Sequence, residues 1–116
     1  MRLRLGTLTI ILMQLARPVW AACGPVPMPP PAYDHPPTHY FIDERVNHWE
    51  VDAECRRLGD FSYQTSRLEA CVIAGRFDAP PIRIIPNDAD PAYAECLIAH
   101  ENGHLNGWAY YHPDAI

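Results

Sequence analysis

The order of hydrophobic and polar residues predicts two helices of different length. In the first, Val51, Cys55 and Leu58 fall at helical spacing, and Gly59 follows directly after them. This pattern predicts a short amphipathic helix over residues 51–58 that ends at the glycine.

The second predicted helix, over residues 91–106, has signals at both ends. Asp90 is a natural N-cap, Pro91 fits the first helical position, and Gly107 is a typical C-terminal stop. Its apolar stripe consists of Ala94, Leu97, Ile98 and Leu105. We expect this helix to be the best defined element of the chain.

Three apolar runs predict short strands at residues 39–42, 68–74 and 82–85, the last two rich in β-branched side chains. Prolines at 80, 81 and 86 surround the last run. Because proline has no amide hydrogen for a central ladder, we expect strand 82–85 at the edge of the sheet. Strands and helices together in 116 residues predict one small α+β domain.

The first residues have the pattern of a secretory signal peptide. Arg2 and Arg4 precede an apolar run over residues 5–16, and small residues follow near Ala21. The run is too short for a membrane span, which takes about 20 residues. We therefore interpret residues 1–21 as a cleaved signal peptide and the protein as exported, either periplasmic or secreted.

Proline is unusually frequent, and seven of the 13 prolines lie between residues 23 and 37. Proline holds the backbone near polyproline II, so residues 22–38 are interpreted as a semi-rigid linker ahead of a folded domain at 39–116. The alternative is a segment that lies across the active surface.

Four cysteines in an exported chain predict two disulfides. Three pairings are open, and we favour Cys55–Cys71 because each lies in a short apolar element with a compact loop between them. Ala21-Ala22-Cys23 also resembles a bacterial lipobox, so a lipid anchor at Cys23 is an alternative. Zinc binding by cysteines is a further one, although the chain has no Cys-x-x-Cys spacing.

Charge excludes some partners. All nine basic residues are arginine, and after residue 21 six arginines face 14 acidic residues, a net charge of −8. That sign argues against a protein that tracks nucleic-acid phosphates or docks on anionic lipid.

The predicted second helix contains a complete HExxH motif, His100-Glu101-Asn102-Gly103-His104. Histidines at i and i+4 point from one helical face and can bind one Zn²⁺, with Glu101 beside the open position of the metal. In such a site the glutamate is the general base that takes a proton from the activated water.

A catalytic zinc takes three protein ligands. Our main candidate for the third is His112, because Gly107 can turn the chain back and five residues reach at most about 17 Å. Weaker candidates for a metal ligand, including a fourth from the proline-rich segment, are Asp114, Tyr110, Glu69, His48, Cys23 and Asp34. Tyr110 could alternatively stabilise an oxyanion or simply pack.

HENGHLNG resembles the HExxHxxG core of the metzincin branch of the zincin metallopeptidases. Metzincins place their third histidine three residues after that glycine, where this chain has Tyr110, and His112 follows two residues later. The longer string HENGHLNGWAYYHP resembles small exported bacterial proteins that end in HExGHxxGW…HP. The resemblance covers the last third of the chain.

This resemblance implies a zincin-like fold in which an edge strand precedes the active-site helix. It also implies a peptide or protein substrate that binds as an added strand, here along residues 82–85. The expected function is that of an exported zinc metallopeptidase with His100, His104 and His112 as ligands and Glu101 as catalytic base. The alternatives are a non-catalytic envelope module held together by zinc and disulfides, or by disulfides alone.

Overall fold

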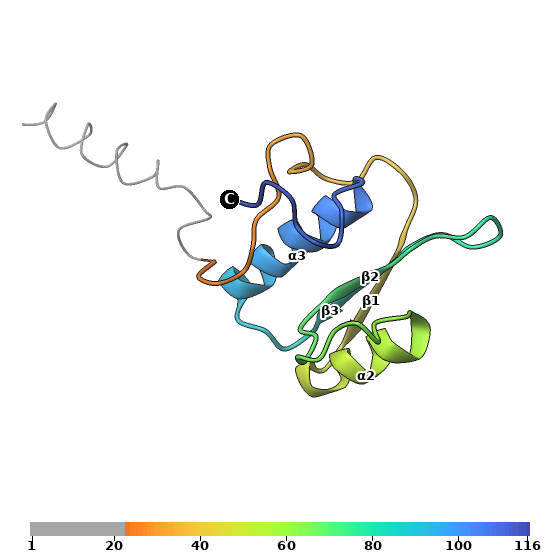
Figure 1. The fold of residues 1–116 in the computed structure, drawn as a ribbon. Helices are drawn as coiled ribbons and strands as arrows, with labels where there is room; N and C mark the ends of the chain where they lie inside the picture. The colour runs from red at the N-terminus through yellow and green to blue at the C-terminus, as the bar shows by residue number, and fades with distance from the viewer. Residues whose placement is uncertain (1–22) are drawn as a thin grey trace, which may run out of the picture.

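The computed structural model describes residues 23–116, so the predicted signal peptide lies outside the described residues. This part of the chain is a small α+β domain stabilised by two disulfides (Figure 1). Its elements in chain order are β1 (Ile42–Val46), α2 (His48–Leu58), β2 (Cys71–Ile73), β3 (Ile82–Pro86) and α3 (Pro91–Leu105). Among residues 23–116, neither helix is long and apolar enough to cross a membrane.

The strands form one sheet in the order β1-β3-β2, with β1 parallel and β2 antiparallel to β3. Successive side chains of β3 point to opposite faces. Ile84 packs with Val51 and Cys55 of α2, while Ile85 packs with Leu97 of α3. The two helices therefore cover opposite faces of the sheet, and both apolar faces of the central strand are buried.

The prediction that residues 82–85 form an edge strand is wrong, because β3 is the central strand. The prolines lie at the ends of β3. There the hydrogen bonds between strands need only the carbonyl of a proline or the amide of the residue next to it. Ile42 N–H donates to Pro81 O at 2.9 Å, and Asn87 N–H donates to Val46 O at 2.7 Å. No proline falls where an interior amide donor is required, which is why β3 can be the central strand. The edges of the described sheet are β1 and β2.

The predicted helices are confirmed. Helix α3 spans 91–105 against a prediction of 91–106. Helix α2 begins three residues earlier than predicted, and Asp88 accepts a hydrogen bond from the His48 amide at 2.9 Å. A carboxylate 40 residues away thus satisfies an amide at the start of the helix.

The strands differ more from their predictions. The strand predicted at 39–42 lies at Ile42–Val46, where pairing with β3 places it, and β2 covers only the centre of the run 68–74.

The favoured disulfide Cys55–Cys71 is confirmed, and the second bond joins Cys23 to Cys96 of α3. Both bonds leave no free cysteine among the described residues. Since the sulfur of Cys23 is already bonded, the alternatives of a lipid anchor or a metal ligand at this cysteine do not fit the structure.

The interpretation of the proline-rich segment as a linker is wrong, because residues 23–38 pack along α3 (Figure 1). We call this segment the strap. Cys23, Met28 and Pro29 are buried, and Met28 exchanges two backbone hydrogen bonds with Ile116. Rigid polyproline backbone with a disulfide at one end makes the strap a part of the domain.

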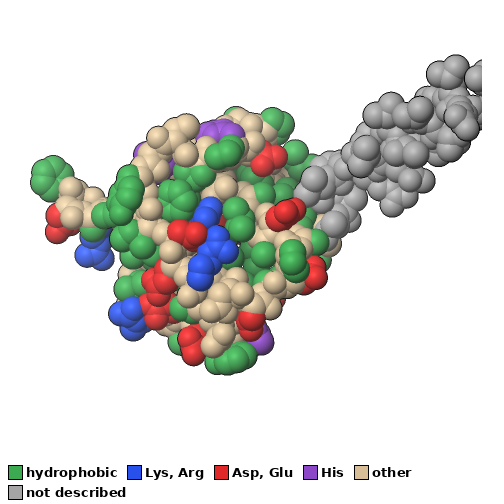
Figure 2. Space-filling model, turned by 180° about the vertical axis from the view of Figure 1, so that it is seen from behind, with side chains coloured by type: hydrophobic (Ala, Val, Ile, Leu, Met, Phe, Trp, Pro, Cys, Tyr) green, Lys and Arg blue, Asp and Glu red, His purple; other side chains and the backbone are tan. Residues whose placement is uncertain are grey.

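Charged side chains of both signs lie next to one another on the face seen in Figure 2. Four of the six arginines in the described part of the chain pair with carboxylates: Arg45 and Arg83 with Asp43, Arg56 with Asp52, and Arg57 with Glu54.

Candidate metal centre

Helix α3 places the first two histidines of the candidate site. His100 and His104 are one turn apart, so their side chains leave the same helical face. Their Nε2 atoms lie 3.2 Å from each other.

The C-terminus of α3 brings the third histidine to the same point. Gly107 has a φ of +103°, which favours glycine, and two hydrogen bonds close the turn: Gly107 N–H to His104 O at 3.1 Å and Trp108 N–H to Gly103 O at 2.9 Å. This is a Schellman motif, which reverses the chain after the helix. His112 then returns, and its Nε2 lies 3.1 Å from that of His100 and 3.2 Å from that of His104.

The three Nε2 atoms have the arrangement of a metal site. A tetrahedral zinc with zinc–nitrogen distances of about 2.0–2.1 Å separates its ligand nitrogens by roughly 3.3–3.4 Å. The distances of 3.1–3.2 Å between the nitrogens are close to this value. The three histidines could therefore hold a metal ion.

Backbone carbonyls set the orientation of two of the rings. His100 Nδ1 bonds to Pro27 O of the strap, and His104 Nδ1 bonds to Trp108 O at 2.8 Å. A ring that donates through Nδ1–H keeps the lone pair on Nε2. Neutral rings with their lone pairs directed at one point repel each other unless a cation lies between them, so these contacts fit a metal-binding role.

Burial keeps the three rings neutral. It lowers the pKa of His100 to about 4, and it also lowers the pKa values of His104 and His112. The physical cause is the cost of a charged imidazolium in a poorly hydrated place. A neutral imidazole keeps one ring nitrogen without a proton, so a proton does not compete with a metal for that nitrogen at neutral pH.

Glu101 lies beside the three histidines. Its Oε1 is 3.9 Å from His100 Nε2, and the residue is only 5% exposed. Burial raises the pKa of Glu101 to about 8, against the opposing effect of the Arg83 charge. A cation held by the histidines would favour the carboxylate and lower this pKa again.

Aromatic rings and the strap support the site from behind. Trp108 is 2% exposed, and its ring centroid lies 5.0–5.3 Å from those of the three histidines. Gly103 allows this packing, because a Cβ there would lie 2.8 Å from Pro29 Cβ and 2.9 Å from Trp108 Cε3. The middle glycine of HENGH therefore lets the strap and the tryptophan approach the helix.

The front of the site is open through two cavities. The larger, about 350 Å³, lies between the strap residues 25–27 and the segment 64–70, and His100, Glu101 and His112 line it. The smaller, about 80 Å³, is lined by the same three residues together with His104, Tyr110 and residues of β2. A ligand can thus reach the nitrogens and the carboxylate from the side away from Trp108.

The other candidate ligands lie outside the histidine cluster of the described chain. His48 pairs with Asp88, and Glu69 accepts a hydrogen bond from Tyr93. Asp34 and Asp114 are exposed. Tyr110 stacks on His104 with ring centroids 5.0 Å apart, and its hydroxyl donates to Val72 O at 3.4 Å, so its role here is packing and an edge contact.

Sequence reasoning missed the groups behind the site. Pro27 and Trp108 act through backbone carbonyls, which every residue has, so no side-chain pattern reveals them. Arg83 is buried in β3, donates to Asn102 Oδ1 at 2.6 Å and pairs with Asp43. In the sequence, a single arginine within an apolar strand was the one sign that Arg83 has buried polar partners.

Fold and site together define a small, disulfide-bonded α+β domain with three histidines that could hold a metal ion. In comparisons with known proteins, no protein-family model, no curated protein and no solved structure matches this chain. The case for a function therefore rests on the geometry of the site.

Proposed function

We propose that this protein is a small exported zinc-dependent peptidase that hydrolyses peptide bonds at the three-histidine site. The observation that carries the proposal is the convergence of three Nε2 atoms beside a buried carboxylate that lines an open cavity. Two disulfides fit a periplasmic or secreted protein, since such bonds persist in oxidising compartments.

Zinc is the metal that three neutral imidazoles in near-tetrahedral arrangement suit best. His100, His104 and His112 would hold it, beside the two cavities that these histidines help to line. When bound, zinc lowers the pKa of a coordinated water and polarises a peptide carbonyl.

Glu101 is the general base in this proposal. Its carboxylate neighbours the ligand nitrogens without belonging to the cluster, so it is placed to accept a proton from water and pass it to the leaving amine. Burial raises the pKa of Glu101 to about 8, and a cation held by the histidines would lower it towards the ionised form that accepts a proton.

The substrate would bind along β2, which replaces the predicted strand 82–85 as the edge next to the site. Cys71 and Val72 line the smaller cavity, and the carbonyl of Val72 already accepts the Tyr110 hydroxyl. A peptide that pairs with β2 would place its backbone beside Glu101 and would displace this long hydrogen bond.

A non-catalytic module stabilised by zinc is the second candidate. The candidate ligands lie within residues 100–112 and join α3 only to the turn that follows it. The sheet, α2 and the strap are held by the two disulfides and the core clusters. A metal in this place would link little of the chain, which favours the catalytic candidate.

The test compares wild type with Glu101→Gln, and Glu95→Gln on the exposed side of α3 is the matched control. Zinc content is measured by elemental analysis, and hydrolysis with a mixture of quenched fluorescent peptides. We expect one zinc in all three proteins and at least about a hundredfold slower hydrolysis in Glu101→Gln alone. Undiminished hydrolysis in Glu101→Gln would refute the role of Glu101.

Chelation separates the two candidates. We expect the zinc-free protein to lose hydrolysis and to keep its far-UV circular dichroism spectrum, because the disulfides remain. Unfolding on chelation, with no hydrolysis by the zinc-loaded protein, would favour the stabilised module.

A further inference from the structure

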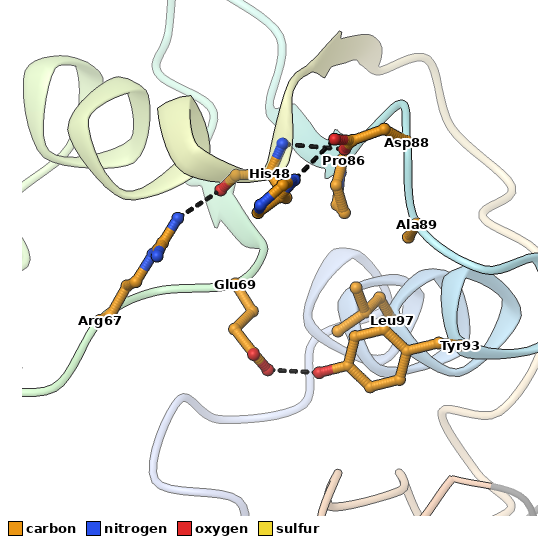
Figure 3. A pocket seen from close by; sticks show the side chains of 8 residues that line it. All are labelled: His48, Arg67, Glu69, Pro86, Asp88, Ala89, Tyr93 and Leu97. Carbon is orange, nitrogen blue, oxygen red and sulfur yellow. Dashed lines mark hydrogen bonds and ion pairs between the residues drawn. The ribbon is translucent and has the colours of Figure 1, made fainter.

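A third cavity, of about 330 Å³, lies between the start of α2, the end of β3 and the start of α3 (Figure 3). We call it the helix-start cavity. Tyr93 and Leu97 line it from α3, Arg67 and Glu69 from the segment before β2, and His48 and Asp88 from the other side. The three histidines of the candidate metal centre are not among its lining residues.

The polar side chains around the helix-start cavity already have partners in the protein. His48 Nδ1 bonds to Asp88 Oδ2 at 2.6 Å, Arg67 donates to His48 O at 2.9 Å, and Tyr93 donates to Glu69. Figure 3 shows these contacts at the edges of the cavity. The charge of Arg67 is opposed by those of Glu69 and Asp88, so the lining has no excess positive charge that would select an acidic ligand.

The remaining lining is apolar. Leu97 is 4% exposed, Pro86 is buried, and Ala89 and the Tyr93 ring are half-buried. An apolar group that enters this space loses contact with water and displaces no hydrogen bond between protein groups.

The helix-start cavity lies next to the larger cavity of the metal centre, because Arg67, Glu69 and Leu97 line both. Leu97 and Tyr93 precede Glu101 by four and eight residues, which is about 6 and 12 Å along a helix. An extended peptide rises about 3.3 Å per residue. A peptide that pairs with β2 and continues past Glu69, beside α3, would therefore place its second to fourth residue from the cleaved bond in this cavity.

We propose that the helix-start cavity is a specificity pocket that takes a large apolar side chain of the substrate, two to four residues from the bond that is cleaved. The proposal rests on the proposed peptidase function for its role in cleavage, whereas the binding of an apolar side chain requires neither the metal nor Glu101.

The first test measures binding without hydrolysis. N-acetyl-phenylalanine amide is titrated into the protein and followed by NMR at the signals of Ala89 and Leu97, with N-acetyl-aspartic acid amide as the matched ligand. We expect the phenylalanine ligand to shift these signals and to bind about tenfold more tightly than the aspartic acid ligand. Equal binding, or shifts confined to other parts of the domain, would overturn the pocket.

The second test fills the cavity from its rim. Ala89→Phe and the smaller Ala89→Leu place a side chain in the cavity, whereas Ala92→Phe adds the same ring at an exposed position of α3 outside the lining. We expect both Ala89 variants to keep their zinc and melting temperature and to weaken phenylalanine binding about tenfold, and Ala92→Phe to bind like wild type.

Cleavage then separates the two proposals. Peptides with Phe, Lys or Asp at the second to fourth positions from the bond should be cut with a preference for Phe that Ala89→Phe removes. A preference for Lys or Asp, or none in wild type, would overturn the specificity role and leave the peptidase standing. Absence of all hydrolysis with Ala89-dependent phenylalanine binding would overturn the peptidase and leave the pocket standing.

Discussion

At the residue scale, the candidate site depends on two backbone carbonyls that orient histidine rings and on a glycine that leaves room beside the helix. The carbonyls of Pro27 and Trp108 hold the Nδ1 atoms of His100 and His104, which leaves Nε2 free to bind a metal. Gly103 lies between these histidines and contacts both the strap and Trp108. The glycine therefore lets both parts approach the helix.

Gly103→Ala provides a sharp test because two effects have opposite signs. Alanine in a helix interior is favoured over glycine by about 1 kcal/mol. A Cβ at this position would clash with Pro29 and Trp108, and such overpacking costs about 1–3 kcal/mol. We expect the free energy of unfolding to fall, as measured by urea denaturation. A rise would show that the strap does not pack against this glycine.

At the element scale, the strap and the turn after α3 assemble the site around the helix. The Cys23–Cys96 disulfide ties the strap to α3, whereas Cys55–Cys71 ties α2 to β2 on the other face of the sheet. Loop-closure entropy predicts stabilisation of about 4 kcal/mol for the first and about 3 kcal/mol for the second. Only the first bond holds an element that contacts a candidate metal ligand.

The two disulfides are therefore expected to differ in their effect on the metal. Removal of Cys23–Cys96 by double substitution with alanine should weaken zinc binding about tenfold, because the Pro27 carbonyl loses its fixed place beside His100. Removal of Cys55–Cys71 should lower stability and leave the zinc affinity unchanged. Competition with a chromophoric chelator measures both affinities, and equal losses would contradict the role of the strap.

At the scale of the whole molecule, the acidic chain depends on carboxylates that accept hydrogen bonds in the fold. Asp52 accepts the Leu68 amide at 2.8 Å and pairs with Arg56, whose guanidinium also donates to three carbonyls of the segment 61–66. The Leu68 amide, and then Arg56, hold the pKa of Asp52 below its ordinary value of 3.8. This cluster fastens the wall of the larger cavity to α2.

A depressed pKa in the folded state gives the sign of the pH dependence. Asp52 contributes stability above about pH 3.8, its unfolded value, and that contribution is lost as the pH falls through the lower folded value. We expect the unfolding free energy of the metal-free protein to decrease on acidification below pH 4. The decrease should be smaller in Asp52→Asn, and Asp78→Asn on the exposed loop is the control. Equal pH profiles for Asp52→Asn and wild type would contradict this role.

Local patterns determined much of this protein. Helix α3, its stop at Gly107, the pairing of Cys55 with Cys71 and the convergence of His100, His104 and His112 followed from spacing, caps and loop length, because these depend on neighbours within one turn or one short loop. Only the tertiary structure decided the central place of β3, the docking of the strap and the carbonyls behind the histidines. Strand order and backbone contacts depend on packing between segments far apart in the chain. Proline content shows that a segment is rigid, but not whether it packs against the rest of the domain.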